Sequence, residues 1–222
     1  IGQGGKGVLL CGASGVPPAK VVILGAGVVG ANACKVAVGI GARVSVLDVR
    51  PERLSYLHDI TQGHVTTFIS NRMTIREEIT DADLVIGAVL IPGAITPKLV
   101  TRSMLRRMRP GSAIVDVSVD QGGCFETTRP TTHEEPTYIE EGIVHYCVSN
   151  IPGAYPRTST LALTNATFPY ILQIADKGYE RAFEENEALR RGLNLIDGKV
   201  VHRGVAESFG LPFVQNPYNP FP

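Results

Sequence analysis

One stretch constrains the fold of this chain more than any other: residues 21–48, which read VVILGAGVVGANACKVAVGIGARVSVLD. Four apolar residues suit a buried strand, a Gly-Ala-Gly-Val-Val-Gly turn follows, and an alanine-rich apolar run then suits a helix that Gly41 ends. A second strand closes on Asp48. A glycine pattern of this spacing is weak evidence by itself, but the strand before it, the helix after it and the acid beyond it make it specific.

Each residue of this pattern has a physical role in holding a dinucleotide. Gly25 permits the tight turn out of the strand, Gly27 leaves the backbone open to a pyrophosphate, and Gly30 lets the helix pack closely on the strand. Val28 and Val29 begin the helix, whose unpaired N–H groups and positive dipole end would face the phosphates. The alternative interpretation is a glycine turn in an α/β domain that holds no ligand.

Asp48 predicts which nicotinamide cofactor is bound. At the tip of the second strand, its carboxylate would accept hydrogen bonds from both ribose hydroxyls of an adenosine and repel a 2′-phosphate, so the pattern favours NAD over NADP. Arg50 and Arg53 lie just beyond it, and an arginine near this position can hold a 2′-phosphate. These arginines weaken the preference for NAD without reversing it.

The segments that follow predict an α/β fold, a Rossmann-type doubly wound parallel sheet. Strand-like segments occur at residues 64–70, 83–90, 112–117 and 143–148, and helix-like segments occur at 51–60, 74–80 and 97–108. Thr74 and Glu77 are predicted to form a capping box, and residues 91–94 are predicted to form a turn without polar side chains. We place a cofactor-binding domain at residues 1–151.

Residues 152–222 have a different character. The pattern predicts a helix over 158–187 with a break or kink near Phe168–Pro169, a hairpin around Asp197–Gly198, and a short helix over 205–209. This part is too small to build a core of its own, so we expect it to pack on the sheet or on a missing segment.

Composition excludes several classes of function. The chain has 222 residues with 21 basic and 21 acidic side chains, and this balance argues against a protein that binds nucleic acid or an anionic membrane. A net charge near zero also suits self-association. Scattered cysteines favour reduced thiols in a cytoplasmic protein, the histidines follow no metal-binding spacing, and neither a serine-hydrolase elbow nor a P-loop is present.

Polar residues follow two of the predicted strands, at the edge where ligands bind in such sheets. Asp120 is the acid best placed to face a nicotinamide ring, where it would accept a proton or orient a water or an ammonia; an aspartate of a turn or helix cap is an equally good interpretation. Asn150 reads as a ligand of cofactor or substrate, or as a turn asparagine. Val89 and Leu90 read as cofactor contacts or as plain core.

Several stretches together resemble the L-alanine dehydrogenase family, which is related to the NAD-binding subunit of transhydrogenase. The resemblance covers nearly the whole chain, and its most specific motifs are VDQGGCFETTRPTTH and VSNIPGAYPRTST. It implies NAD as cofactor, L-alanine and pyruvate as substrates, a homo-oligomer that is a hexamer in the family, and Asp120 as the catalytic aspartate. The cofactor contacts that it implies, besides the glycine turn and Asp48, are Arg53, Ser70, Val89, Leu90, Val117, Ser118, Val119, Asp120, Arg129, Val148, Ser149, Asn150 and Ile151.

The resemblance also implies that half of a substrate domain precedes Ile1 in the family, with a lysine, an arginine and a histidine that grip the substrate carboxylate and do acid–base work. Residues 152–222 then resemble the C-terminal part of that domain. We therefore expect a truncated form that binds NAD but oxidises alanine poorly. The alternatives are a non-catalytic NAD-binding module and a transhydrogenase-like NAD(H)-binding subunit.

Overall fold

A computed structural model of the chain describes residues 2, 4–91 and 95–218. The chain folds into two compact units, one of residues 1–91 and 95–151 and the other of residues 92–94 and 152–222. The first unit contains the glycine pattern and every strand predicted before residue 150, and the second contains the C-terminal helices.

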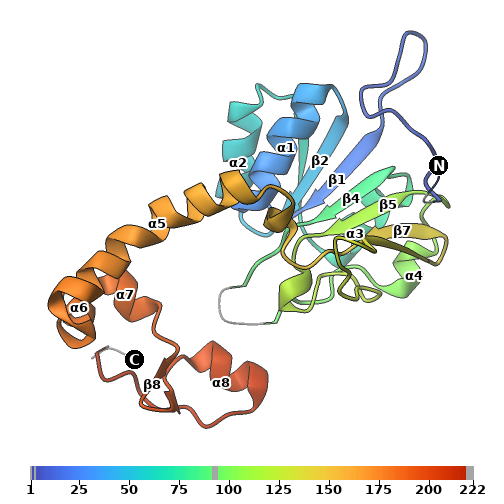
Figure 1. Cartoon of the computed structure of the whole chain (residues 1–222). Helices are drawn as coiled ribbons and strands as arrows, with labels where there is room; N and C mark the ends of the chain where they lie inside the picture. The colour runs from blue at the N-terminus through green and yellow to red at the C-terminus, as the bar shows by residue number, and fades with distance from the viewer. Residues whose placement is uncertain (1, 3, 92–94, 219–222) are drawn as a thin grey trace. The chain divides into compact units, whose positions relative to one another are not determined.

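The first unit is built on a seven-stranded sheet in the order β3-β2-β1-β4-β5-β7-β6 (Figure 1). All neighbouring strands are parallel except the pair β6 and β7. The strands are β1 (Lys20–Leu24), β2 (Arg43–Asp48), β3 (Val65–Ile69), β4 (Leu84–Gly87), β5 (Ala113–Asp116), β6 (Thr137–Glu140) and β7 (Ile143–Tyr146). The predicted α/β sheet is therefore confirmed as a mostly parallel one.

Helices cover both faces of the sheet, and the alternation of side chains along β1 explains why. Val22 and Leu24 pack with residues of α3 and α4 on one face, whereas Val21 and Ile23 pack with residues of α1 and α2 on the other. Figure 1 shows α1 and α2 on one side of the sheet and α3 and α4 on the other. Successive side chains of a strand point to opposite faces, so a fully apolar strand needs cover on both. The helices are α1 (Val28–Ile40), α2 (Pro51–Ile60), α3 (Arg72–Thr80) and α4 (Arg102–Leu105).

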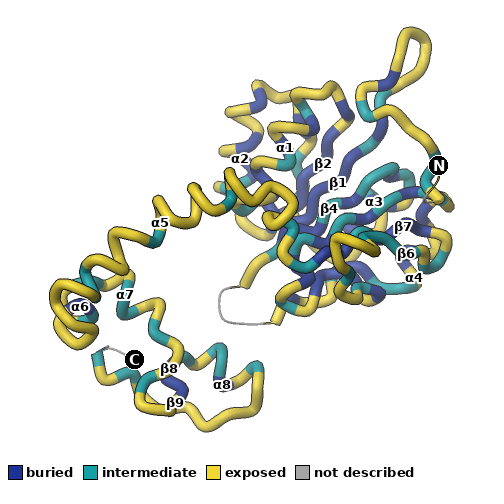
Figure 2. Tube along the Cα trace, in the orientation of Figure 1, coloured by how far each residue is buried: buried dark blue, intermediate teal, exposed yellow. Residues whose placement is uncertain are grey.

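The central strands form the most deeply buried part of the first unit, as the dark tube in Figure 2 shows. β1 lies at the centre of this core, and four of its five residues are buried. Gly41 ends α1 in a left-handed conformation with φ 93°, as expected for a helix that stops at glycine. The predicted strand, turn, helix, strand and terminal acid are thus all present within residues 20–48.

Several expectations for the first unit were wrong. The predicted helix 97–108 is only the single turn α4, because the backbone N–H groups of Leu99 and Val100 bond to the carbonyl of Cys124 instead. The capping box of α3 uses Asn71 and Thr74, not Thr74 and Glu77, so the helix starts two residues early. The antiparallel strand β6 was not predicted, and the strands expected to end at residues 90, 117 and 148 stop at Gly87, Asp116 and Tyr146.

The second unit is mainly helical. Its long helix α5 runs without a break through Pro169, and the break comes instead at Gly178, which has φ 76°. The predicted hairpin is confirmed, with Asp197 and Gly198 both at positive φ as a tight two-residue turn requires. Its elements are α5 (Pro156–Lys177), α6 (Tyr179–Glu185), α7 (Glu187–Arg191), β8 (Leu195–Ile196), β9 (Lys199–Val200) and α8 (Arg203–Phe209). The short helix η2 (Ile151–Ala154) begins at the last residue of the first unit.

Candidate functional site

The three glycines of the turn between β1 and α1 meet three different surroundings. Gly25 has φ 102°, and a Cβ there would lie 2.6 Å from the carbonyl oxygen of Ala88. A Cβ on Gly30 would lie only 1.8 Å from the carbonyl oxygen of Gly25. A Cβ on Gly27 would meet nothing within 4 Å. Two of these glycines are therefore required by packing, whereas the third leaves open space at the start of α1.

Asp48 lies beside this turn and is almost fully buried. Its Oδ2 accepts a hydrogen bond from the Ala26 N–H at 2.6 Å, and its Oδ1 accepts from the N–H and the Nε of Arg50 at 2.9 and 3.3 Å. Burial by itself raises the pKa of Asp48, but these hydrogen bonds and the Arg50 charge outweigh it and hold the pKa below its ordinary value. Asp48 is therefore ionised at neutral pH and already fixes the turn through Ala26.

Two further predicted residues lie close to Asp48. The Nε of Arg53 donates to the carbonyl oxygen of Ala26 at 2.9 Å, and the backbone N–H of Ser70 donates to the carbonyl oxygen of Asp48 at 2.9 Å. Arg50, which the sequence left as a possible 2′-phosphate ligand, instead forms an ion pair with Asp48. The residues predicted for the adenosine end thus come together at the ends of β1, β2 and β3.

A cleft of about 140 Å³ lies at the ends of β4 and β5. Its walls are mainly apolar, with one carboxylate and one amide among them. The residues that line it are Val29, Ala88, Val89, Leu90, Val117, Ser118, Asp120 and Gln121. Six predicted site residues therefore line one cleft in the first unit, namely Val29, Val89, Leu90, Val117, Ser118 and Asp120.

Asp120 is held by its own short helix and touches the loop after β7. It lies in η1 (Val119–Gln121), and its Oδ2 accepts a hydrogen bond from the N–H of Asn150 at 3.4 Å. Asn150 has φ 56°, and its carbonyl oxygen lies 3.2 Å from Nε2 of His133. The sequence pointed to Asp120 and Asn150 separately and assigned no role to any histidine, so it did not predict that these three residues are linked through Asn150.

The loop that carries Asp120 is organised around a buried carboxylate, that of Asp116. Its Oδ1 accepts from the N–H of Ser118 at 3.0 Å, and its Oδ2 accepts from the N–H of Cys124 at 2.9 Å and from the hydroxyl of Thr128. Burial and the charge of Asp116 raise the pKa of the Cys124 thiol well above its ordinary value, so that thiol stays protonated. A Cβ on Gly123 would lie 2.5 Å from Asp116 Oδ2, so the glycine leaves room for the carboxylate.

Asp116 was not predicted from the sequence, although a signal was present. A single charged residue in an otherwise apolar strand must either face solvent or find several donors when buried. Gln121 was missed as well: among the residues that the structure describes, its Oε1 is buried without a hydrogen-bond partner, like the hydroxyl of Thr96. No signal in the sequence marks Gln121, because its role depends on the loop conformation.

The other predicted residues are not among those that line the cleft. The side chains of Val119 and Val148 are buried, whereas Val28 is 77% exposed at the start of α1. Arg129 stacks its guanidinium 3.9 Å from the ring centre of Tyr138. Ser149 donates its N–H to the carbonyl oxygen of Thr131. Ile151 begins η2, and three of the four residues of the predicted turn 91–94 lie outside the described residues.

A family model for the C-terminal domain of alanine dehydrogenase/PNT matches residues 2–203. The chain belongs to the alanine dehydrogenase/PNT family. Alanine dehydrogenases from Halomonas elongata and Methanococcus maripaludis are 54% and 57% identical to it over 213 and 212 residues, or 96% and 95% of the chain. The chain spans 57% of the length of each of these relatives.

Solved structures agree with this family membership. An L-alanine dehydrogenase is 51% identical with a TM-score of 0.83, over 94% of this chain and 58% of that one. A transhydrogenase from Sinorhizobium meliloti is 33% identical with a TM-score of 0.61, over 69% of this chain and 44% of that one. The expected resemblance to alanine dehydrogenase is therefore confirmed for this family member.

Neither a metal centre nor a membrane span is found in the part of the chain that the structure describes. Among residues 2, 4–91 and 95–218, no group of three or more His, Cys, Asp or Glu side chains is placed to hold a metal ion. Within the same ranges, no helix combines the length and the apolar character that a membrane crossing requires.

Proposed function

We propose that this chain is the NAD(H)-binding part of an alanine dehydrogenase, an enzyme that converts L-alanine, NAD and water to pyruvate, ammonia and NADH. The observation that carries the proposal is the open backbone at Gly27, between two tightly packed glycines and beside an ionised Asp48. The identity of 51–57% to proteins named alanine dehydrogenase supports it. A pyrophosphate would lie at the start of α1, where N–H groups face the open space.

The residues present fit a nicotinamide dinucleotide. Asp48, Arg53 and Ser70 would hold the adenosine end, because the Oδ2 of Asp48 keeps acceptor capacity beyond its bond to the Ala26 N–H. The apolar walls Val89 and Leu90 would cover the ring in the cleft. The Oε1 of Gln121, which has no hydrogen-bond partner among the described residues, would supply an acceptor for an amide N–H there. When bound, the nicotinamide supplies the hydride acceptor.

In this proposal Asp120 is the catalytic aspartate, and its carboxylate accepts a proton or orients a water or an ammonia. Its carboxylate lines the cleft and, among the described residues, receives a single long hydrogen bond, from the N–H of Asn150, so it would retain acceptor capacity for a proton or for a substrate water or ammonia. Asp116 acts as a positioning residue, because its bonds to Ser118 and Cys124 fix the loop on either side of Asp120.

The domain assignment and the assembly belong to the same proposal. Residues 1–151 would be the NAD-binding domain, and residues 152–222 the C-terminal part of the substrate domain. The proposal also includes a homo-oligomer, which the family resemblance implies is a hexamer, and a cytoplasmic location. The four cysteines, all free thiols in the structure, support a reducing compartment.

The first test changes Asp48 to Asn and titrates NADH and NADPH into the 222-residue chain by calorimetry. We expect the native chain to prefer NADH, and Asp48→Asn to lose roughly 10–100-fold in NADH affinity, the equivalent of one hydrogen bond to a charged acceptor. Affinity for NADPH should not fall in parallel, because the variant no longer repels a 2′-phosphate. The exposed Asp59→Asn on α2 is the matched control. A native chain that binds both cofactors equally would contradict the proposal.

The second test measures turnover of L-alanine with saturating NAD. The described residues that line the cleft include no lysine or arginine, so nothing in it anchors the substrate carboxylate. We expect the polypeptide of residues 1–222, on its own, to bind NADH while turning over alanine well below about 1 per second. A rate in the ordinary range of about 1–1000 per second would refute the expected impairment.

A transhydrogenase-like NAD(H)-binding subunit is the second enzymatic candidate. The 33% identity to the Sinorhizobium meliloti transhydrogenase supports it less than 51–57% identity supports the first proposal. That candidate requires a partner that presents NADP. The remaining alternative, a non-catalytic NAD-binding module, would be favoured if the chain binds NADH but shows no activity in any assembly.

A further inference from the structure

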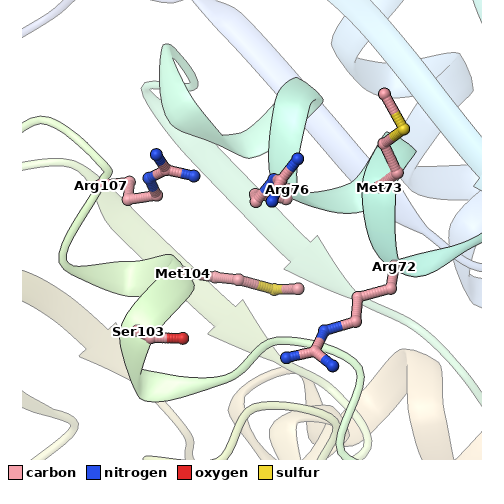
Figure 3. A pocket seen from close by; sticks show the side chains of 6 residues that line it. All are labelled: Arg72, Met73, Arg76, Ser103, Met104 and Arg107. Carbon is pink, nitrogen blue, oxygen red and sulfur yellow. The ribbon is translucent and has the colours of Figure 1, made fainter.

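A second cavity, open to solvent, lies between α3 and α4, and none of the residues that line it is assigned to the cofactor, although Ser70 precedes Arg72 by two residues. It has a volume of about 430 Å³, and its walls come from the first two turns of α3 and from α4 and its end (Figure 3). The lining residues are Arg72, Met73, Arg76, Ser103, Met104 and Arg107. Figure 3 shows the three arginine side chains around one shared space, two from α3 and one from the opposite wall.

The three arginines of this cavity carry uncompensated charge. No acidic residue lines the cavity, and among the described residues no carboxylate forms an ion pair with Arg72, Arg76 or Arg107. Arg72 and Arg76 are also four residues apart on one helix, a spacing at which like charges destabilise the helix. The arrangement therefore has a cost that an anion in the cavity would remove.

Two neighbouring arginines, Arg102 and Arg106, do have carboxylate partners, so the lack of ion pairs at the cavity does not extend to them. Arg102 and Arg106, also at α4, both bond to Glu141, at 2.7 and 2.9 Å. On α3, Glu78 pairs with Lys20 at 3.0 Å, away from the cavity. Among the described residues, the three arginines of this cavity therefore lack the carboxylate partners that the adjacent Arg102 and Arg106 have.

The lining residues indicate the class of ligand. Guanidinium groups bind phosphate oxygens in pairs of parallel hydrogen bonds, and three of them suit more than one phosphate. Met104 is buried in the wall and Met73 is 59% exposed, so two polarizable thioethers offer contact to a ring or carbon chain. The hydroxyl of Ser103 adds a donor, and the volume lies within the range of small-molecule sites, about 300–1000 Å³.

The start of α3 does not itself bind the anion. Asn71 Oδ1 already accepts the N–H groups of Met73 and Thr74, at 2.9 and 3.0 Å. Recognition would therefore rest on the arginine side chains. We propose that this cavity is a binding site for a small organic polyphosphate of the nucleotide class, separate from the cofactor site.

Tripolyphosphate is the probe for a direct test by calorimetry. The 222-residue chain is first saturated with NADH, which occupies the glycine turn, at about 0.15 M salt, where distant surface charges are screened. We expect saturable binding of one tripolyphosphate per chain and tighter binding of ATP, whose adenosine would contact Met73 and Met104. The variant Arg72→Gln/Arg76→Gln/Arg107→Gln should weaken both ligands about tenfold or more while leaving NADH affinity unchanged.

Arg43→Gln is the matched control, because Arg43 is exposed on β2 without an ion pair among the described residues. It should leave tripolyphosphate binding unchanged. The single variants Arg76→Gln and Arg107→Gln repeat the test if the triple variant unfolds early on heating. The proposal is overturned if the native chain shows no saturable binding, if the lining variants bind like the native chain, or if Arg43→Gln weakens binding equally. Tighter binding of a glutamate-rich peptide than of ATP would overturn it too, in favour of an acidic protein partner.

Discussion

Gly30→Ala is expected to destabilise the first unit by about 3 kcal/mol or more, whereas Gly27→Ala is expected to leave its stability within about 0.5 kcal/mol of the native chain. The added methyl of Gly30→Ala would lie 1.8 Å from the carbonyl oxygen of Gly25 and 3.3 Å from a side-chain methyl of Ile23. The closer atom belongs to the backbone of the turn, so no side-chain rotation relieves the overlap. The turn and α1 would have to separate.

The same small change at Gly27 meets open space, at a φ of −68° that alanine adopts freely. Its methyl would instead occupy the approach of the proposed pyrophosphate. We expect Gly27→Ala to lose about tenfold or more in NADH affinity. Chemical denaturation gives the stabilities and calorimetry gives the affinities.

Gly39→Ala on the same helix is the control for both variants. Gly39 is exposed, and a Cβ there meets nothing within 4 Å. Alanine favours a helix interior over glycine by about 0.5–1 kcal/mol, so this variant should gain a little stability and bind NADH normally. If Gly30→Ala were as stable as the native chain, the close packing of α1 on the turn would be wrong. If Gly27→Ala bound NADH normally, the cofactor would not approach this backbone.

The contrast between these glycines marks what the sequence predicts well. Around β1 the local signals agree, because the apolar run, the glycines and the helix end at Gly41 all specify the same conformation. Roles for Gly25, Gly27 and Gly30 were therefore assigned from spacing, and the structure places them in three matching environments. Whether a cofactor binds there stays a prediction.

In other parts of the chain, hydrogen bonds to residues distant in sequence determine a structure that differs from the one the local pattern predicts. Residues 97–108 have a helical pattern, but Leu99 and Val100 donate to Cys124, and Val100 bridges to Phe125. Those bonds connect segments more than about 20 residues apart and leave no trace in a short window of sequence. The helix α5 shows the opposite case, because it continues through Pro169, where local rules predict a break.

The candidate site shows the same contrast between residues that local sequence patterns indicate and contacts that form only between distant segments. The sequence singled out Asp120 because it follows a predicted strand, and Val89 and Leu90 because they end another, at the edge where ligands bind in this type of sheet. All three line the cleft, and their roles stay predictions. The contacts among Asp120, Asn150 and His133 depend on how two loops meet, so no spacing rule reveals them. The unpaired oxygen of Gln121, among the described residues, is apparent only in the folded loop, whereas Asp116 could have been noticed as a lone charge in an apolar strand.

Asp116→Asn is expected to cost roughly 3 kcal/mol, which corresponds to a fall in melting temperature of roughly 6–12 °C for a chain of this size. The carboxylate receives donors on both oxygens: Ser118 on Oδ1, and Cys124 and Thr128 on Oδ2. An asparagine amide offers one oxygen only, and its NH₂ group would face N–H or O–H donors. At least one buried donor loses its partner, and each hydrogen bond to a charged group is worth about 1.5–3 kcal/mol.

Asp120→Asn, four residues along the same loop, is the matched control for Asp116→Asn. Asp120 is exposed and, within the part of the chain that the structure describes, accepts one bond, the 3.4 Å bond from Asn150, so its variant should remain within about 0.5 kcal/mol of native stability. Thermal unfolding followed by circular dichroism separates the two variants, and proteolysis within residues 117–128 reports on the loop directly. Equal stability of both variants would mean that Asp116 does not organise the loop. The position of Asp120 in the cleft would then rest on the Asn150 contact alone.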